Sequence, residues 1–362
     1  MRIAFYAPLK SPNHPVVSGD RQVARLMIRA LELAGHTVEV ASELRAYMPE
    51  PDENRFRELM KDAEGEAQRL RSTWRSASAP DLWFTYHPYY KSPDLIGPRL
   101  AKEFSIPYVT LEASYSARRS IGAWKEAQAR VVAGVRQAAV NLCLTQRDHD
   151  GLSAAVPDAA FAMLPPFVDA AALFGPGIAE SGKRLIAVGM MRPGDKLASY
   201  RSLANALMLI EHLPWTLSIV GDGPCRDEVR AMFQEFAAER ITYHGHLEQP
   251  RVFEALQTSD ILVWPGCGEA FGLAYLEAQA AGLAVIAQAT AGVPEVVRNG
   301  ETGLLTPEGD AEAYAAAIAL LLQDGTERRR LGDNARRFVQ HERSLEAAAH
   351  RLTNLLPRMA VA

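Results

Sequence analysis

The residues whose types and spacing could do chemistry lie in the stretch 264–284, W-P-G-C-G-E-A-F-G-L-A-Y-L-E-A-Q-A-A-G-L-A. An apolar run ends at the first residue of this stretch, and a proline with two glycines then predicts a loop. A helix is expected to begin near Phe271 and to end at Gly282. Glu269 lies in the loop and Glu277 two turns along the helix, so the stretch carries two carboxylates that can accept hydrogen bonds from hydroxyl groups.

The start of this helix is a predicted anion site. The backbone N–H groups of Phe271, Gly272 and Leu273 have no partners within the helix and lie at the positive end of its dipole. A phosphate can bind at such a helix start. We therefore expect the stretch to bind a charged ligand that is rich in hydroxyl groups.

Two cations form a second candidate group. The sequence G-M-M-R-P-G-D-K follows a predicted strand at 184–188 and places Arg192 and Lys196 in a loop at the C-terminal end of that strand. Such a pair suits a diphosphate and can stabilise charge that grows on a leaving phosphate. The alternative is that both are ordinary loop cations. The sequence V-G-D-G-P at 220–224 predicts a tight turn before a further helix.

Two side chains in the first half are candidates for substrate binding or catalysis. His87, in F-T-Y-H-P-Y-Y-K, and Glu112, in V-T-L-E-A-S-Y, each follow a predicted strand. For each, a structural hydrogen bond is the alternative. The sequence Asp148-His149-Asp150 spells D-x-D, a pattern that can hold a metal, but it lies at a predicted helix start without further ligands nearby. We expect it to cap the helix and to contact solvent.

Strands and helices alternate along the chain, and this order predicts parallel α/β sheets. Strands are expected at 2–7, 37–41, 82–86, 107–111, 140–145, 160–164, 184–188, 216–220, 241–243, 261–264, 284–287 and 303–305. Helices are expected at 21–34, 199–211, 225–238, 249–257, 271–281 and 310–323, and the tail 326–357 is expected to be helical.

The length of 362 residues predicts two domains. Residues 1–168 and 183–342 are expected to form two Rossmann-like α/β domains, joined by a proline- and glycine-rich linker at 169–182. The two domains are expected to face each other across a cleft, in which a ligand would meet the C-terminal ends of the strands. Residues 343–362 are expected to form a C-terminal helix.

Composition and charge exclude several classes of protein. Apolar residues make up 48% and charged residues 23% of the chain, as in ordinary globular enzymes, and the net charge of −4 argues against nucleic-acid binding. The three cysteines lack metal-binding spacing and favour a reducing cytoplasm. No apolar run is long enough for a signal peptide or a membrane span. We expect a cytoplasmic protein, and peripheral contact with the inner face of the cell membrane stays open.

The segment 50–79 is rich in mixed charge and carries Arg69, Arg71, Trp74 and Arg75 at its basic end. A solvated helix is one interpretation of this pattern. A face that contacts a membrane surface or a polyanion is the other.

The order of these motifs resembles the retaining glycosyltransferases of family 4, which have the GT-B fold of two Rossmann-like domains. The matching segments are V-G-D-G-P (220–224), H-G-H-L (244–247), S-D-I-L-V-W-P (259–265), E-A-F-G-L-A-Y-L-E (269–277), A-A-G-L-A-V-I-A (280–287) and G-V-P-E-V-V-R-N-G-E-T-G-L-L (292–305). Looser matches in the first half are A-G-H-T-V-E-V (34–40) and P-F-V-D (166–169). The resemblance covers nearly the whole chain, and its E-x7-E pattern is specific.

The resemblance implies that the second domain binds a nucleotide-sugar donor, UDP-sugar rather than GDP-sugar, and that the first domain binds the acceptor. Glu277 would then bind the ribose hydroxyls and Glu269 would lie beside the donor sugar. Arg192 and Lys196 would hold the diphosphate. The remaining donor-binding residues would be Gly19, Gly221, His246 and Leu247, together with Phe271, Gly272 and Leu273. No metal and no cofactor would be needed, and the C-terminal helix would cross back onto the first domain.

Three departures from the family pattern bear on these roles. Met190 follows Gly189 where the family usually has an arginine, so the roles of the two cations assume a re-shaped loop. The first loop has Gly19 where two adjacent glycines are usual. Many members have a histidine after the fourth strand, where this chain has Glu112, so either Glu112 or His87 would act on the acceptor side.

We therefore expect a metal-independent, retaining hexosyltransferase that moves a sugar from a nucleoside diphosphate to a hydroxyl acceptor. A lipid, a saccharide or a small metabolite could be that acceptor, and no residue pattern chooses among them. One alternative is a UDP-sugar epimerase or hydrolase of the same fold. The other is a nucleotide-sugar-binding protein without catalytic activity.

Overall fold

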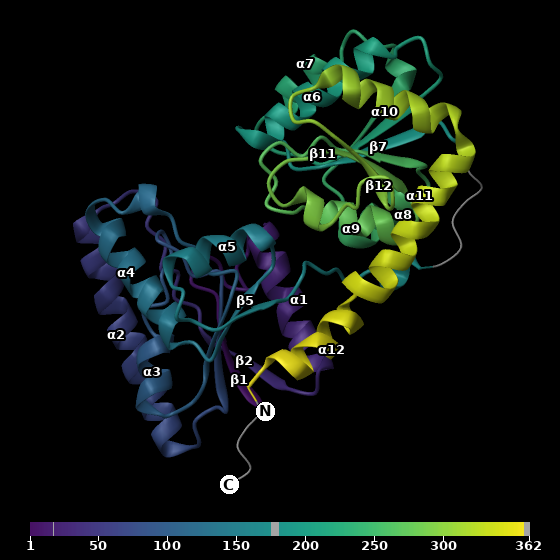
Figure 1. Cartoon of the computed structure of the whole chain (residues 1–362). Coiled ribbons are helices and arrows are strands. Elements are labelled where there is room, and N and C mark those ends of the chain that lie inside the picture. The colour runs from purple at the N-terminus through teal and green to yellow at the C-terminus, as the bar shows by residue number, and fades with distance from the viewer. Residues whose placement is uncertain (17, 175–180, 358–362) are drawn as a thin grey trace. The chain divides into compact units, whose positions relative to one another are not determined.

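The computed structural model describes residues 1–16, 18–174 and 181–357. The chain divides into two compact units, which Figure 1 shows: unit 1 comprises Met1–Pro165 with Leu345–Ala362, and unit 2 comprises Pro166–Ser344. Of the predicted linker 169–182, residues 175–180 lie outside the described part of the chain. The same holds for 358–362 of the predicted C-terminal helix.

Unit 1 is built on six parallel strands in the order β2-β1-β3-β4-β5-β6. The strands are β1 (Arg2–Tyr6), β2 (Thr37–Ser42), β3 (Leu82–Tyr86), β4 (Tyr108–Leu111), β5 (Val140–Cys143) and β6 (Phe161–Met163). All six were expected from the sequence, with small differences at their ends. The strand order reverses direction between β1 and β3, and ligands of such sheets bind outside the C-terminal ends of the strands at that point.

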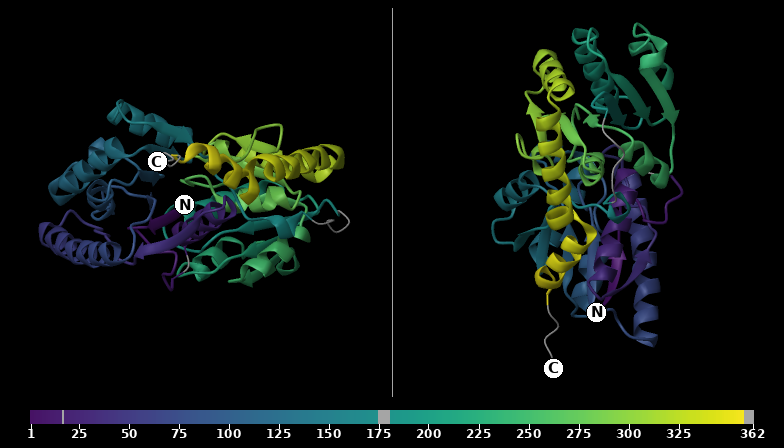
Figure 2. Two further views of the ribbon diagram at one scale, coloured as in Figure 1. Left: turned by 90° about the horizontal axis from the view of Figure 1, so that it is seen from below. Right: turned by 90° about the vertical axis from the view of Figure 1, so that its right-hand side faces the viewer.

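Helices cover both faces of this sheet. They are α1 (Gly19–Leu33), α2 (Glu53–Ser76), α3 (Gly97–Glu103), α4 (Gly122–Gln137), α5 (Gln146–Ala155) and α12 (Leu345–Leu355). In Figure 1, α2, α3 and α4 lie on one face and α1 and α12 on the other. The helix α5 packs beside α4, because Leu152 and Val156 share a buried cluster with Val131 and Val135. The helix α12 comes from the far end of the chain and packs against α1, as the views of Figure 2 also show.

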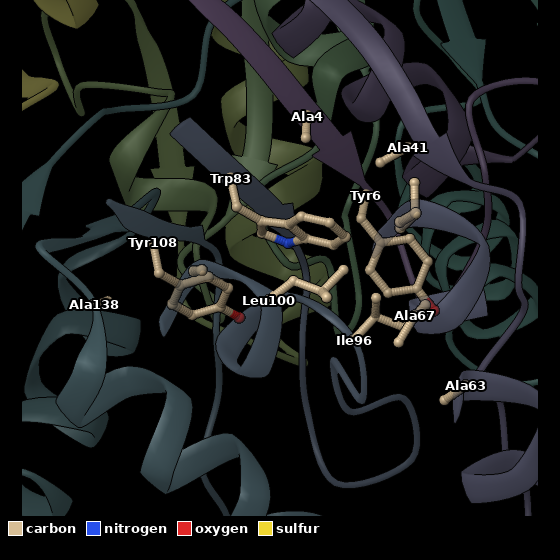
Figure 3. Packing of buried hydrophobic residues seen from close by; sticks show 12 residues of the cluster. Ala4, Tyr6, Ala41, Ala63, Ala67, Trp83, Ile96, Leu100, Tyr108 and Ala138 are labelled. Carbon is tan, nitrogen blue, oxygen red and sulfur yellow. The ribbon is translucent and has the colours of Figure 1, made fainter. Parts of the chain in front are cut away.

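A cluster of aromatic and aliphatic side chains forms part of the core of unit 1 (Figure 3). Trp83, Tyr6 and Tyr108 are fully or almost fully buried in it. The buried carboxylate of Asp94 accepts hydrogen bonds from the indole of Trp83, from the hydroxyl of Thr85 and from the backbone N–H of Gly97. Asp94 therefore ties β3 to the start of α3.

Unit 2 has a second parallel sheet of six strands, in the order β12-β11-β10-β7-β8-β9. The strands are β7 (Arg184–Val188), β8 (Thr216–Val220), β9 (Ile241–Gly245), β10 (Ile261–Val263), β11 (Ala284–Gln288) and β12 (Gly303–Thr306). All were expected. Counted from β7, this is the Rossmann order 3-2-1-4-5-6 written in reverse, so the switch point lies between β7 and β10.

The helices of unit 2 also lie on both faces of its sheet (Figure 1). They are α6 (Asp195–Leu209), α7 (Arg226–Met232), α8 (Gln249–Gln257), α9 (Leu273–Ala280), α10 (Ala311–Gln323) and α11 (Gly325–Phe338). The prediction for α8 was correct at both ends. The prediction of 225–238 for α7 was too long, because α7 ends at Met232 and Ala238–Arg240 forms a separate 3-10 turn before β9.

The tail 326–357 is not one continuous helix. A π-helical turn at Val339–Arg343 follows α11, and Ser344 is extended (ψ 164°) before α12 begins. Ser344 pairs there with Val168 as an isolated β-bridge. The break separates α11, which belongs to unit 2, from α12, which belongs to unit 1.

Candidate active site

Three side chains of unit 2 meet at the switch point between β7 and β10. The Lys196 ammonium forms an ion pair with Oε1 of Glu269, and the indole Nε1 of Trp264 donates a hydrogen bond of 3.1 Å to the same oxygen. Lys196 Nζ also lies 5.5 Å from the centre of the Trp264 ring, at cation–π distance. The ion pair is largely shielded from solvent, since 18% of the Lys196 side chain and 15% of the Glu269 side chain are exposed.

Aromatic side chains hold this group in place. The Tyr275 hydroxyl donates to the Trp264 carbonyl at 3.0 Å, and the Tyr200 hydroxyl donates to the Gly189 carbonyl at 2.6 Å. The rings of Tyr200 and Trp264 pack edge to face with centroids 4.9 Å apart. Together, these contacts connect the residues that follow β7 with those that follow β10, next to the Lys196–Glu269 pair.

The glycine loop fits closely around Tyr275. Gly266 has φ +77°, and a Cβ at this position would collide with the Tyr275 hydroxyl. The same loop is anchored to α6, because the N–H of Cys267 donates to Oγ of Ser199 at 3.0 Å. A glycine is thus required at 266 both by the left-handed backbone and by the lack of space.

The helix that follows the loop starts later than expected. Gly272 has φ +79° and is the N-cap of α9, so Phe271 and Gly272 precede the helix and Leu273 is its first residue. The prediction of a helix start at 271 was wrong, because a left-handed residue cannot belong to a right-handed helix. Glu277 is consequently about one turn along α9, not two, and it is 7% exposed.

The two predicted cations are not equivalent. Lys196 lies in the first turn of α6, because the N-cap Gly194 (φ +85°) ends the loop earlier than the predicted start at 199. Arg192 remains in the loop, is exposed, and forms no hydrogen bond or ion pair with any of the residues that the structure describes. The structure therefore brings Lys196, but not Arg192, to Glu269.

The other residues of unit 2 that were predicted to bind the nucleotide-sugar donor follow the neighbouring strands β8 and β9. Gly221 follows β8, and its N–H donates to the Gly245 carbonyl at 2.9 Å. His246 follows β9, is exposed, and lies 3.5 Å from a carboxylate oxygen of Glu248. Leu247 is half-buried beside it.

Unit 1 brings together both of its predicted residues and one that the sequence did not reveal. His87 and Glu112 are the first residues after the adjacent strands β3 and β4, and both have left-handed backbones (φ 57° and 55°). Nδ1 of His87 lies 3.3 Å from Oδ1 of Asp20, which belongs to the first turn of α1. Gly19 precedes Asp20 as the first residue of α1 and has open space around it.

Burial and charge act on this group in opposite directions. Burial alone lowers the pKa of His87, but the carboxylates of Glu112 and Asp20 outweigh it and raise that pKa above its usual value. Burial raises the pKa of the Glu112 carboxyl group, and the charge of His87 opposes this only in part. Burial would also raise the pKa of Asp20, but its contact with His87 holds that pKa below the usual value.

The prediction that the D-x-D sequence caps the helix was wrong, because Thr145 is the N-cap of α5 and Asp148 lies in its first turn. Oγ1 of Thr145 accepts a hydrogen bond from the N–H of Asp148 at 3.1 Å, and the Thr145 hydroxyl donates to the Asp148 carboxylate at 2.7 Å. Asp150 is exposed and contacts His149. Among the described residues, no three side chains of the metal-binding types gather in one place.

The basic end of the segment 50–79 is paired within unit 1. Arg71 and Arg75 both bind Glu103, and Arg69 binds Glu66. This pairing fits the interpretation as a solvated helix. Within the described part of the chain, no helix is both long and apolar enough to span a membrane.

The sequence of unit 2 matches a known protein family. Residues 182–324 match the family described as glycosyl transferases group 1. The matched residues lie within unit 2. The group 1 domain contains the whole Lys196–Glu269 site, so the glycosyltransferase family predicted from the sequence is confirmed. The finer assignment to family 4 stays a prediction.

Proteins similar to this chain include N-acetyl-alpha-D-glucosaminyl L-malate synthase of Bacillus anthracis. It is 32% identical over 168 residues, which are 46% of this chain and 43% of that protein. The matched region spans less than half the length of each of the first curated relatives.

Two solved structures resemble the fold as a whole. Sucrose-phosphate synthase from Thermosynechococcus elongatus has a TM-score of 0.74 at 21% identity, with 98% of each chain covered. HepE from Anabaena, solved in complex with UDP, has a TM-score of 0.73 at 14% identity, with 98% of this chain and 99% of that chain covered. The predicted GT-B fold of two Rossmann-like α/β domains is confirmed.

Proposed function

We propose that this protein is a retaining glycosyltransferase that transfers a sugar from a nucleoside diphosphate to a hydroxyl group, without a metal ion. UDP is the favoured nucleotide, because HepE, which has a similar fold, was solved with UDP. The observation that carries the proposal is the Lys196–Glu269 pair at the β7/β10 switch point, beside the start of α9. Nucleotides bind at this position in sheets of the Rossmann order.

Lys196 has the chemistry to hold the diphosphate. Its ammonium group has three hydrogen-bond donors, and Glu269 accepts one of them in the free protein. The others can bind phosphate oxygens and stabilise the charge that develops on the leaving nucleoside diphosphate. The N–H groups at the start of α9 add the positive end of a helix dipole. In this proposal Arg192 approaches the diphosphate only after its exposed loop rearranges.

The two glutamates would bind different parts of the nucleotide-sugar donor. Glu269 would accept hydrogen bonds from the sugar, because it is oriented by Lys196 and by the indole of Trp264. Glu277 would accept hydrogen bonds from the ribose hydroxyls. His87 and Glu112 of unit 1 would bind the acceptor, so the acceptor is selected by a different unit from the donor.

A transfer assay with matched variants tests this proposal. Lys196→Ala and Glu269→Ala should each lower the rate of transfer by about 100-fold or more, since each removes a charge that stabilises the transition state. Lys183→Ala and Glu235→Ala change exposed residues of the same charge in unit 2 and should leave the rate unchanged. Unchanged turnover in both site variants would refute the proposal.

The nucleotide can be identified by thermal stability. A ligand that binds only the folded protein raises its melting temperature. We expect UDP-glucose to raise it more than GDP-mannose or ADP-glucose does, and Lys196→Ala to reduce the effect. A larger shift with GDP-mannose would replace UDP by GDP in the proposal.

A further inference from the structure

Asp20 has a position in unit 1 that its role in the helix does not explain. It lies in the first turn of α1, where a carboxylate is favourable because of the helix dipole. That helix start already has a cap, since Oγ of Ser18 accepts a hydrogen bond from the N–H of Arg21 at 3.3 Å. The Asp20 side chain instead lies beside the His87 ring, at the switch point between β1 and β3.

His87 is fixed from several sides. Its left-handed backbone is uncommon for a residue other than glycine and is held by a hydrogen bond of 2.8 Å from its N–H to the Leu111 carbonyl. Its ring stacks on Tyr89 with centroids 5.0 Å apart, and Asp20 contacts Nδ1. These contacts restrict the ring, although Nδ1 has no hydrogen bond of ordinary geometry among the described residues.

Glu112 lies next to this fixed ring and has an unused acceptor. Its Oε2 is buried and has no partner at ordinary hydrogen-bond geometry among the described residues, while the Tyr86 hydroxyl interacts with the carboxyl group and lowers its pKa. A buried carboxylate oxygen without a partner is costly, and such groups are uncommon in folded proteins. A hydroxyl group that enters the site would supply the missing hydrogen bond.

We infer that Asp20 is a positioning residue, which holds the His87 ring beside Glu112 so that Oε2 of Glu112 can accept a hydrogen bond from the acceptor hydroxyl. This inference rests on the proposed function, because it assigns parts to the acceptor side of the same reaction. His87 then serves as the fixed cation of the site, and Glu112 is the group that contacts the acceptor hydroxyl.

The charges around His87 agree with its role as the cation of the site. The acidic groups that face it are Asp20 from α1, Glu112 after β4 and Asp148 from α5. Tyr86 precedes it in β3, and Tyr89 covers its ring. Lys10 also acts on Asp20, in the direction that favours the charged carboxylate. With three carboxylates around one imidazole, the protonated form of His87 is favoured.

NMR titration of the histidine side chains in the ligand-free full chain tests the contact. Asp20→Asn should lower the pKa of His87 by about one unit or more, because a neighbouring charge is removed. Asp20→Glu, which keeps the charge, should restore most of the shift. The matched control is Asp150→Asn, since Asp150 lies 3.1 Å from His149 at the surface. It should leave the titration of His87 unchanged.

A merely structural role of Asp20 would give a different result. Asp20→Asn would then change the melting temperature but not the titration of His87, and this would overturn the inference. If Asp20→Asn does not fold, the titration of His87 in Asp20→Glu tests the inference. A pKa of His87 at its ordinary value in that variant would also overturn the inference.

The pH dependence of the rate at which the protein turns over the nucleotide-sugar is a second measurement. If the protonated His87 is the working form, activity is lost as the pH rises through its pKa, and Asp20→Asn moves this alkaline limb to lower pH. The affinity for UDP should not change, and a tenfold weaker affinity would show instead that Asp20 serves the donor. If the wild type turns over no nucleotide-sugar, the proposed function fails, while the NMR titration still decides the contact between Asp20 and His87.

Discussion

The Lys196–Glu269 pair is the most informative contact at the scale of single residues. Both side chains are largely buried, and removing one partner of such a pair leaves the other charge uncompensated. A buried ion pair is in general no more stabilising than well-packed apolar residues of similar volume. Its position at the switch point agrees with the proposed donor site, where a cation would bind an anionic ligand.

Trp264 makes a further contribution that can be isolated by mutation. Trp264→Phe keeps an aromatic ring but removes the N–H donor to Glu269 Oε1, a hydrogen bond to a charged group. We expect transfer to fall by roughly tenfold or more, as for other hydrogen bonds of this kind. The control is Trp215→Phe, which removes a buried indole donor to the Ile210 carbonyl elsewhere in unit 2. Equal losses of activity in the two variants would contradict a specific role for Trp264.

The raised pKa of His87 implies that the stability of the fold depends on pH. Its pKa is raised in the folded protein, so its protonation stabilises the fold fully below the ordinary value of 6.5. This contribution is lost as the pH rises through the raised pKa. His87→Asn, which tolerates the left-handed backbone, should therefore destabilise the protein more at pH 5.5 than at pH 8.5, values chosen to bracket the ordinary pKa of about 6.5. Urea unfolding at both pH values measures this, and equal losses would show that His87 titrates without linkage to folding.

At the scale of elements, the conformation of the glycine loop before α9 depends on its close packing against Tyr275. Gly266 and Gly309 both have φ +77°, but only at Gly266 would a Cβ collide with another side chain, the Tyr275 hydroxyl. Alanine at either position costs about 1 kcal/mol of backbone strain. Gly266→Ala should in addition displace Tyr275 from the Trp264 carbonyl and reduce transfer severely, while Gly309→Ala should remain active. A Gly266→Ala variant with wild-type turnover would show that the loop tolerates a shift of Tyr275.

The starts of α6 and α9 show where prediction of the elements from sequence reached its limit. Apolar periodicity placed both helices correctly, but Gly194 and Gly272 adopt left-handed conformations that set the true first residues. A sequence does not reveal which of several glycines in a loop will have positive φ. This matters for the site, because it places Lys196 on a helix and leaves Arg192 in the loop.

At the scale of the whole molecule, α12 makes unit 1 depend on the C-terminal part of the chain. Leu352 of α12 is fully buried, and α12 packs against α1. Leu352→Ala should lower the free energy of unfolding of unit 1 by about 2–5 kcal/mol and leave unit 2 unchanged. Hydrogen exchange resolved by unit measures this, with Asn354→Ala, an exposed change on the same helix, as control. Equal loss of protection in both units would mean that they unfold together.

Alternation of strands and helices was enough to predict both sheets, because buried parallel strands are short apolar runs bounded by turns. The contact of Asp20 with His87 was not predictable in the same way. It depends on the strand order β2-β1-β3, which brings the start of α1 beside the end of β3. The ion pair between Lys196 and Glu269 likewise depends on β7 lying next to β10, and both partners were predicted only as separate candidates.

Calorimetric titration of UDP tests most directly whether unit 2 binds a nucleotide at the β7/β10 switch point. UDP should bind the wild type, and Lys196→Ala should weaken the binding by about tenfold or more, since it removes a charge-assisted hydrogen bond. Lys183→Ala should bind UDP as the wild type does. Equal affinity of the wild type and Lys196→Ala for UDP would contradict the assignment of the donor site.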